Sequence, residues 1–173
     1  MTHSNARRQA GLALLESLIA LTILASALLG MLFVQLRTQA DTESALRRAQ
    51  ALRLIDDLAE RIQSNPGAVA ELGSYRIDWG AAPATAINCE AQWCNPSQLA
   101  QWDLAHWKAG VARALPLGDA AVFDIPSLAP GTPRRMLGVM VGWHARGGDA
   151  FALSVPGTSC PAGLACHFGH VQP

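Results

Sequence analysis

Hydrophobic residues dominate the first part of the chain without a charged interruption. From Ser17 to Leu36 none of the 20 positions carries a charged side chain. An α-helix of about 20 apolar residues crosses the roughly 30 Å hydrocarbon core of a bilayer. This segment therefore predicts a membrane-spanning helix close to the N-terminus.

Beyond Arg37 the apolar residues recur at steps of three or four, which is the spacing of one helix face. No Gly or Pro interrupts residues 31–64, and the Asn-Pro-Gly sequence at 65–67 then ends the helix, because proline disfavours α geometry in the residue before it. We expect one helix from Leu12 to Ser64, whose second half turns an apolar face to a soluble domain. That face is predicted to hold Leu46, Ala49, Leu52, Ile55, Leu58 or Ala59, and Ile62.

A second helix is predicted after residue 95. Asn95 and Pro96 suit the N-cap and the first turn, and Pro116 and Gly118 close the helix. One face is expected to carry Leu99, Asp103, Trp107, Val111 and Leu115. Trp102 and Trp107 are interpreted as packing residues, and Asp103 with His106 as a surface pair three residues apart.

Short alternating segments predict strands. These are residues 74–79, Ala120–Ile125, Arg135–Trp143 and Phe151–Val155, with Gly147-Gly148 as a hairpin signal between the last two. The predicted fold class is α+β: a long N-terminal helix, half transmembrane and half amphipathic, packed on a three- or four-stranded antiparallel sheet. The second helix lies in the region between the long helix and the sheet.

The length of 173 residues fits one soluble domain plus a membrane element. Lys and Arg together number 13, as do Asp and Glu, so no net charge attracts the chain to nucleic acid. The sequence contains no Gly-x-Ser-x-Gly, His-Glu-x-x-His or Gly-x4-Gly-Lys pattern. We therefore predict no enzyme, no cofactor and no small-molecule substrate.

The four cysteines form two closely spaced pairs, Cys89 with Cys94 and Cys160 with Cys166. An even number beyond a membrane segment indicates an oxidising compartment and two disulfides. Three connectivities remain open. Local pairing is preferred because short loops close at little entropic cost.

A metal site is the alternative interpretation of the same residues. Cys160, Cys166, His167 and His170 form a Cys/His cluster, which Cys89 and Cys94 could complete. The Cys-x2-Cys spacing typical of zinc knuckles is absent, so disulfides are favoured and no metal is predicted.

Glu16 lies inside the apolar run, where a carboxylate costs roughly 2.5–3.5 kcal/mol on insertion scales. A secretory signal peptide would use Arg7 and Arg8 as its basic region and cleave after Ala27, but the apolar sequence continues beyond that point. A signal anchor fits the length, and the positive-inside rule places the N-terminus in the cytoplasm and the cysteines outside. Neither alternative explains Glu16.

A third interpretation does explain it. A short basic leader ends in Gly11, hydrophobic Leu12 follows, and Glu16 stands at the fifth place after the glycine. This resembles the prepilin signature of type IV pilins and type II secretion pseudopilins. The resemblance implies that a prepilin peptidase cleaves after Gly11 and N-methylates Leu12, and that the apolar helix is retained.

Cleavage would create a cationic α-amino group at Leu12. Because an unpaired charge buried among packed helices is costly, Glu16 is expected to pair with this amine, and the family precedent favours the amine of a neighbouring subunit. A single polar pair of this kind fixes the register of helix packing, as in coiled coils. Glu16 is thus predicted to direct subunit docking.

Three segments resemble the PilV-type minor pilins, also called type IV pilus modification proteins. They are the leader with "GLALLESLIALTILASALLG", then "LIDDLAERIQSNPGA" and "CNPSQLAQWDLAHW". The resemblance implies a type IV pilin-like fold and a low-abundance subunit that primes or tips the filament, and so affects twitching motility and attachment. Its implied partners are the prepilin peptidase, other minor pilins, the major pilin and inner-membrane lipid.

The implied organisation is a cleaved leader at 1–11, a transmembrane or filament-core helix at 12–36, and a periplasmic, later extracellular, globular domain at 37–173. The chain is expected to cross the inner membrane once and then to enter the pilus at the cell surface. The first alternative is a minor pseudopilin of a type II secretion system. The second is a secreted or anchored Cys/His metal-binding domain.

Overall fold

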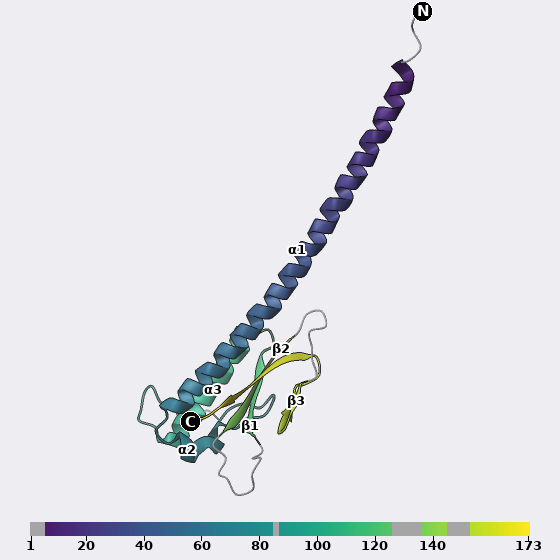
Figure 1. Ribbon diagram of the computed structural model, residues 1–173. Coiled ribbons are helices and arrows are strands. Elements are labelled where there is room, and N and C mark those ends of the chain that lie inside the picture. Colours follow the sequence, from purple (N-terminus) through teal and green to yellow (C-terminus); the bar gives the residue numbers. More distant parts are fainter. Residues whose placement is uncertain (1–5, 85–86, 126–135, 145–152) are drawn as a thin grey trace, which may run out of the picture. The chain divides into compact units, whose positions relative to one another are not determined.

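The computed structural model describes residues 6–84, 87–125, 136–144 and 153–173, with side chains from residue 13 onward. The chain divides into two compact units, Met1–Ser44 and Ala45–Pro173. Helix α1 is continuous over Ala6–Ser64, a length of 59 residues (Figure 1). The predicted single long helix and its end at Ser64 are confirmed.

The unit that begins at Ala45 contains a three-stranded antiparallel sheet in the order β1-β2-β5. Its strands are β1 (Asp119–Asp124), β2 (Leu137–His144) and β5 (Leu164–Val171). Strands β3 (Ser154–Val155) and β4 (Thr158–Ser159) form a separate two-stranded ribbon. The predicted antiparallel sheet is therefore present, with β2 as its central strand.

The C-terminal strands differ from the prediction. The segment 151–155 was expected to pair with 135–143, but β2 pairs with β1 and β5, and only Ser154 and Val155 form a strand, in the small ribbon. Gly147-Gly148, Arg135 and Phe151 lie outside the described residues. Strand β5 was not predicted because its helix-facing positions include Gly169 and His167, so the sequence lacks a clear apolar alternation.

The predicted strand at 74–79 is also largely wrong. Helix α2 (Ala68–Glu71) leads into the 3-10 helix η1 (Leu72–Tyr75), and only Ile77 makes a strand-like bridge, to Val122. Tyr75 and Ile77 are nevertheless buried while Arg76 is exposed. The alternating pattern therefore predicted correctly which of these side chains are buried, although most of the segment forms no β-ladder hydrogen bonds.

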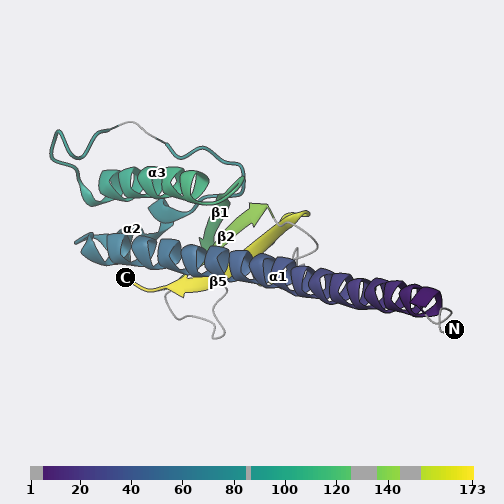
Figure 2. The same ribbon diagram turned by 90° about the horizontal axis from the view of Figure 1, so that it is seen from above.

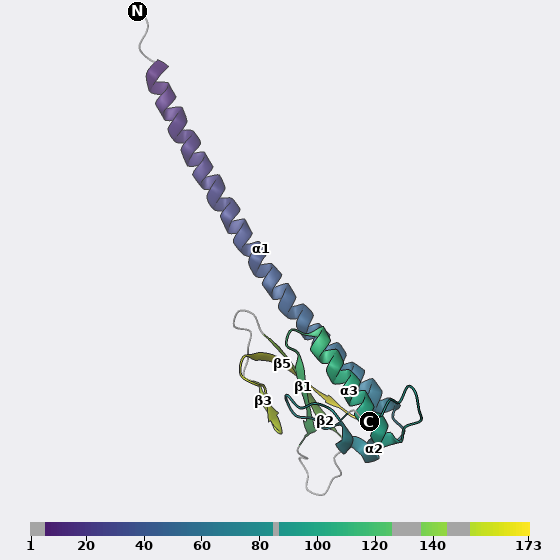
Figure 3. The same ribbon diagram turned by 180° about the vertical axis from the view of Figure 1, so that it is seen from behind.

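One face of the sheet packs on two helices. Helix α3 (Pro96–Ala114) lies beside the part of α1 that belongs to this unit, and both lie over the sheet (Figures 2 and 3). Alternate residues of the central strand point to these helices: Leu137, Val139, Val141 and Trp143. They meet Leu58 and Ile62 of α1 and Trp107 and Val111 of α3 in one continuous core.

The buried face of α1 is shifted from the predicted one. Ala51, Ile55, Leu58 and Ile62 are buried, whereas Leu46 is 65% exposed and Leu52 is 46% exposed, and Ala49 is exposed as well. Successive residues of an α-helix are rotated by about 100° around the axis, so a step of three residues falls about 60° short of a full turn. Several such steps in a row move the side chains to another face of the helix. Leu46 therefore lies about half a turn around the helix from Ile55.

Helix α3 begins as predicted. The Asn95 side chain accepts a hydrogen bond from the Gln98 backbone N–H at 2.9 Å, and the Gln98 side chain accepts one from the Asn95 backbone N–H at 3.0 Å. This reciprocal capping box satisfies two donors that the first turn leaves open. Pro96 at the first helical position completes the N-terminal signal.

The predicted face of α3 is buried from Asp103 to Leu115, with Leu99 half-buried. The proposed surface pair of Asp103 and His106 is wrong, because Asp103 is buried and its carboxylate pairs with Arg61 at 3.5 Å. His106 is exposed and its ring lies 3.9 Å from that of Trp102. Trp107 is 1% exposed, which confirms its role in packing.

Candidate functional site

The side chains of the apolar segment of α1 are exposed and do not pack against the rest of the protein. Every residue from 13 to 36 is exposed. Among the described residues, α1 is the one helix long and apolar enough to cross a membrane, and none of its most apolar stretch is buried within the protein. In water such a surface would be strongly unfavourable, so this segment requires lipid or other apolar helices around it.

Three hydroxyl side chains of this segment are satisfied within the helix. The hydroxyl of Ser17 donates to the Ala13 carbonyl at 2.8 Å, and Thr22 and Ser26 donate to carbonyls three residues earlier, also at 2.8 Å. A hydroxyl that bonds its own helix backbone needs no water. These three hydroxyls therefore suit an apolar environment, and Glu16 is the one charged side chain between residues 13 and 36.

Glu16 is exposed on α1, and Leu12 lies one helical turn before it. Gly11 and Leu12 belong to the helical backbone of α1, which begins at Ala6. The expected cleavage point after Gly11 therefore lies inside the helix of the uncleaved chain. Residues one turn apart face the same side of a helix, so Glu16 and the position of Leu12 share one side.

Both cysteine pairs form local disulfides. Cys89 bonds Cys94 and Cys160 bonds Cys166, so all four sulfur atoms are joined in the pairing preferred from the sequence. Across the described ranges no group of three or more His, Cys, Asp or Glu side chains is arranged to hold a metal ion.

The second disulfide lies on the face of the sheet turned away from the helices. A Cβ atom added at Gly142 of β2 would lie 3.2 Å from the Cys166 sulfur and 3.2 Å from the Trp79 ring. Trp79 in turn donates its indole N–H to the Thr158 hydroxyl of the ribbon at 3.3 Å. The disulfide and Trp79 thus hold the β3–β4 ribbon against the sheet.

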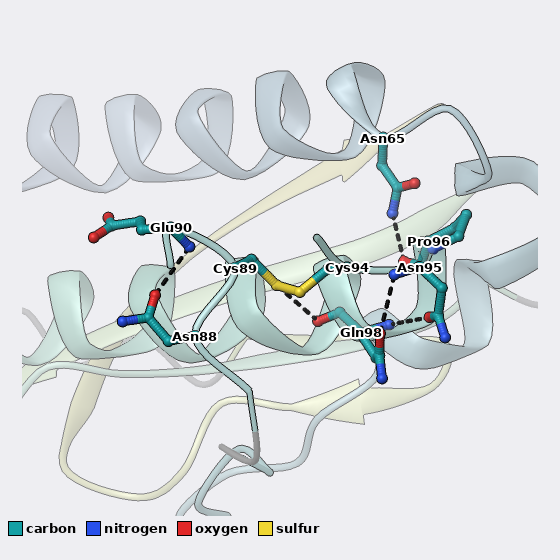
Figure 4. Close-up of a disulfide and its surroundings, with 8 residues drawn as sticks. All are labelled: Asn65, Asn88, Cys89, Glu90, Cys94, Asn95, Pro96 and Gln98. Atoms are coloured by element: carbon teal, nitrogen blue, oxygen red, sulfur yellow. Dashed lines mark hydrogen bonds between the residues drawn. A yellow bond between two sulfur atoms is a disulfide. The ribbon is translucent and has the colours of Figure 1, made fainter. Parts of the chain in front are cut away.

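The first disulfide closes a loop just before α3 (Figure 4). Asn88 opens this loop, with its side-chain oxygen accepting from the Glu90 backbone N–H at 2.9 Å. Cys94 leads directly into the Asn95 cap of α3, so the loop is fixed at both ends.

Asn65 joins the end of α1 to the start of α3. Its side chain is buried and donates to the Tyr75 hydroxyl at 3.1 Å and to the Pro96 carbonyl at 2.8 Å, while its oxygen accepts from the Gly67 N–H at 3.0 Å. Burial raises the pKa of Tyr75. From the sequence, Asn65 was identified only as a helix-ending residue. Its role in joining the two helices depends on its contact with Pro96, 31 positions away, which the sequence does not indicate.

A partly buried charge cluster links the two helices. Arg61 of α1 contacts Asp57 at 3.0 Å and Asp103 of α3 at 3.5 Å. Burial raises the pKa of Asp103, although the charge of Arg61 opposes this shift. The single guanidinium of Arg61 lies within reach of both carboxylates, so it compensates part of their charge and holds the two helices together.

Lys108 is nearly buried and is held by the loop before the sheet. Its ammonium group contacts the Asp119 carboxylate at 3.1 Å and donates to the Asp78 carbonyl at 2.9 Å. The second oxygen of Asp119 accepts from the Gly80 N–H at 2.6 Å, where the backbone has φ of +68°. The lysine therefore anchors α3 to β1 and to the turn at Gly80.

A surface hollow of about 440 Å³ lies between α3 and the segment 73–84. Two charged residues line it, Arg76 and Asp78, and Arg76 pairs with Asp124 at 3.0 Å. Its serine, Ser74, hydrogen-bonds Glu71 at 3.1 Å and Ser97 at 3.2 Å. Both hydrogen bonds of Ser74 join neighbouring parts of the domain, since Glu71 lies three residues earlier and Ser97 lies in the first turn of α3.

Residues 34–105 match the family model described as "Tt1218-like: Type IV pilin Tt1218". The match covers less than half of the chain, and it begins after most of the apolar segment, so it is independent of the leader pattern around Gly11 and Glu16. Neither the curated proteins nor the solved structures gave a match.

The matched region runs from the membrane-proximal helix into α3 and includes the loop closed by Cys89 and Cys94. The long N-terminal helix, the antiparallel sheet and the additional helices agree with a type IV pilin fold. Together they support a structural pilin subunit that is anchored in a membrane by an apolar helix and assembles with other pilus components.

Proposed function

We propose that this chain is a minor type IV pilin, a PilV-type subunit that takes part in pilus assembly and priming. The carrying observation is the exposed apolar segment of α1 with a single carboxylate, Glu16, one turn beyond Leu12. The family match to type IV pilins, over a different part of the chain, supports the same proposal.

In this proposal the precursor is stored in the inner membrane through residues 12–36, and its N-terminus is cytoplasmic. Arg7 and Arg8 favour this orientation under the positive-inside rule. The domain with the two disulfides then lies in the periplasm, where disulfides persist. The prepilin peptidase removes residues 1–11 and N-methylates Leu12.

The new α-amino group of Leu12 is a cation at the start of an apolar helix. Extraction from the membrane brings this helix beside those of other subunits, where charge–charge attraction is weakly screened. Glu16 pairs with the amine of the neighbouring subunit and so sets the axial register of the incoming helix. A mismatched register would leave a carboxylate and an amine both unpaired in apolar surroundings.

The domain from residue 37 onward projects from the filament and contacts other minor pilins and the major pilin. Its role is structural, and it supports twitching motility and attachment through the filament. No catalytic step, cofactor, nucleic acid or small-molecule substrate is part of this function.

A deletion strain tests whether the subunit belongs to a type IV pilus or to a type II secretion system. We expect loss of surface pili and of twitching motility, with secretion of exoproteins unchanged. Loss of exoprotein secretion with normal pili would identify a minor pseudopilin of type II secretion instead. Zinc in the purified protein, or four free thiols, would support the Cys/His metal-binding alternative.

Complementation of that strain tests Glu16. The Glu16→Ala variant should be cleaved normally yet restore few pili, because its helix lacks the docking charge. Ser17→Ala is the matched control, since it removes only a hydroxyl that bonds the Ala13 carbonyl. Normal incorporation of Glu16→Ala into pili would refute the register role.

A further inference from the structure

Trp93 is the most exposed large hydrophobic side chain among the described residues, with 85% of its surface accessible. The other tryptophans of the globular unit are buried or half-buried. Removing an exposed aromatic side chain from water is favourable, because the gain grows with the apolar area that is buried. Tryptophan is also among the residues that most often dominate the binding energy of protein interfaces.

The loop that carries Trp93 is held in one conformation. The Cys89–Cys94 disulfide closes it, and the Asn88 carbonyl accepts from the N–H groups of Ala91 and Gln92, each at 3.2 Å. The next residue after the loop, Asn95, is fixed by the capping box of α3. A side chain presented by a rigid loop loses little conformational freedom on binding, so more of its burial energy appears as affinity.

The loop is seated against α3. The Cys89 sulfur lies 3.9 Å from the Gln98 carbonyl oxygen. Trp102 and His106, whose ring centroids lie 3.9 Å apart with their planes tilted by 45°, follow Gln98 at four-residue steps on one side of the helix. The loop that presents the Trp93 indole is thus attached to the first turn of α3.

The loop closed by Cys89 and Cys94 carries one charged residue, Glu90, and it is acidic. Residues 77–107 contain no Lys or Arg, and their acidic residues are Asp78, Glu90 and Asp103. Asp103 is buried against Arg61, whereas Glu90 is exposed on the Trp93 loop itself. A partner surface that is complementary to this loop carries a basic side chain beside an apolar pocket.

We propose that the Trp93 loop is a docking knob that inserts into an apolar pocket with a basic rim on a neighbouring pilin subunit. Small-molecule sites are concave, whereas this indole stands out from the surface, so the pocket belongs to a protein partner. The proposal rests on the proposed function, because it takes the neighbour to be a subunit of the same filament. It adds a contact in the globular domain to the docking of the α1 helices.

Photo-crosslinking in cells tests the contact directly. A benzophenone amino acid replaces Trp93 in the full-length chain, cells are irradiated, and sheared pili are separated from membranes. We expect an adduct in the pilus fraction whose second component is a pilin by mass spectrometry. The same label at Leu117, which is 78% exposed just beyond the other end of α3, is the control and should give no such adduct.

Two substitutions test the chemistry of the knob. Trp93→Ala should lower the amount of this chain in sheared pili, relative to its membrane pool, at least tenfold. Glu90→Arg should lower it as well, because it places a positive charge against the basic rim, while Glu90→Gln should have a smaller effect. Both positions are exposed, and retained disulfides in the variants establish that the domain has folded.

Each remaining outcome overturns the proposal. An adduct with a non-pilin protein, equal adducts at positions 93 and 117, or normal incorporation of Trp93→Ala would show that the loop does not dock a neighbouring pilin. If the wild-type chain itself is absent from sheared pili, the proposed function fails together with the docking knob. Presence in pili without a specific adduct at 93 refutes only the docking knob.

Discussion

Trp107 of α3 donates its indole N–H to the backbone carbonyl oxygen of Leu54 on α1, across 2.6 Å. The ring is almost completely buried in the core shared by the helices and the sheet. One side chain therefore supplies both apolar packing and a directed hydrogen bond between two helices, through residues that are 53 positions apart along the chain. This contact, with the Arg61–Asp103 pair, fixes α3 on α1.

Trp107→Phe should lower the free energy of unfolding by about 1–3 kcal/mol, because the Leu54 carbonyl loses a partner and the smaller ring leaves a void. Chemical denaturation of the detergent-solubilised full chain, followed by near-UV circular dichroism, measures the loss. Trp102→Phe is the control, since Trp102 is half-buried on the side of α3 with His106. Equal losses in the two variants would contradict the assigned role of Trp107.

Two glycines of the α3 region should respond to alanine in opposite ways. A Cβ atom at Gly118 would lie 2.5 Å from the Val111 carbonyl oxygen, which is backbone and cannot rotate away, so Gly118→Ala should destabilise the domain by about 1–3 kcal/mol. Gly110 is inside α3 with open space around it, so Gly110→Ala should stabilise by about 0.5–1 kcal/mol. Midpoints of thermal unfolding should therefore shift in opposite directions. A shift of the same sign in both variants would contradict the local geometry.

The disulfide pairing can be read from peptides of the non-reduced protein. Each disulfide should be recovered within one local peptide pair, Cys89 with Cys94 and Cys160 with Cys166. The double replacement Cys160→Ser and Cys166→Ser should cost about 2 kcal/mol, because it frees a short loop in the unfolded chain. It should also increase hydrogen exchange in the β3–β4 ribbon, which has only two residue pairs of its own. Recovery of peptides that link 89 or 94 to 160 or 166 would refute the local pairing.

His167 should make stability fall at mildly acidic pH. Burial, and to a smaller degree the charge of Arg48, lower the pKa of His167 below its ordinary 6.5. The unfolded chain then binds the proton more readily, so the free energy of unfolding decreases as pH falls through 6.5 toward the folded-state pKa. His167→Gln should flatten this dependence between pH 7.5 and about 5. His170→Gln, on the same strand but exposed, should retain it, and identical profiles for both variants would contradict the assignment.

The features that follow from local chemistry were predictable from the sequence. The end of α1 at Ser64, the Asn95 cap of α3 and the first two strands of the sheet each rest on signals within a few residues. The fold class was predictable for the same reason, since a long uninterrupted helix followed by short strands has few ways to bury its apolar face.

The features that depend on tertiary contacts were not predictable. Leu46 and Leu52 fit the spacing of a helix face, but they are exposed. Which face of α1 is buried depends on how the helix lies on the rest of the domain, and the spacing alone does not specify this. Strand β5 lacks a strand signal in the sequence because one of its helix-facing positions is Gly169. This position must be small, since a Cβ atom there would lie 3.0 Å from Ile55 on α1. Asp103 was assigned to a local pair, while its actual partner, Arg61, lies 42 residues away in the chain.

The residues of the candidate site also fall into those that the sequence indicates and those that only the structure reveals. Gly11, Leu12 and Glu16 were identified through the resemblance of their spacing to the prepilin signature, because the proposed processing acts on sequence near the N-terminus. Trp93 gave no signal in the sequence, since an exposed and a buried tryptophan look alike there. Only its exposure beside the Cys89–Cys94 disulfide marks it as a contact residue.

The mass of the mature N-terminus shows whether the chain is processed as a prepilin. The chain is purified from membranes and from sheared pili, and its N-terminal peptide is measured by mass spectrometry. We expect a chain that starts at N-methylated Leu12 and retains Glu16 and the whole apolar segment. A chain that starts at Leu28, as after signal-peptide cleavage, or one that still carries Met1 would contradict it.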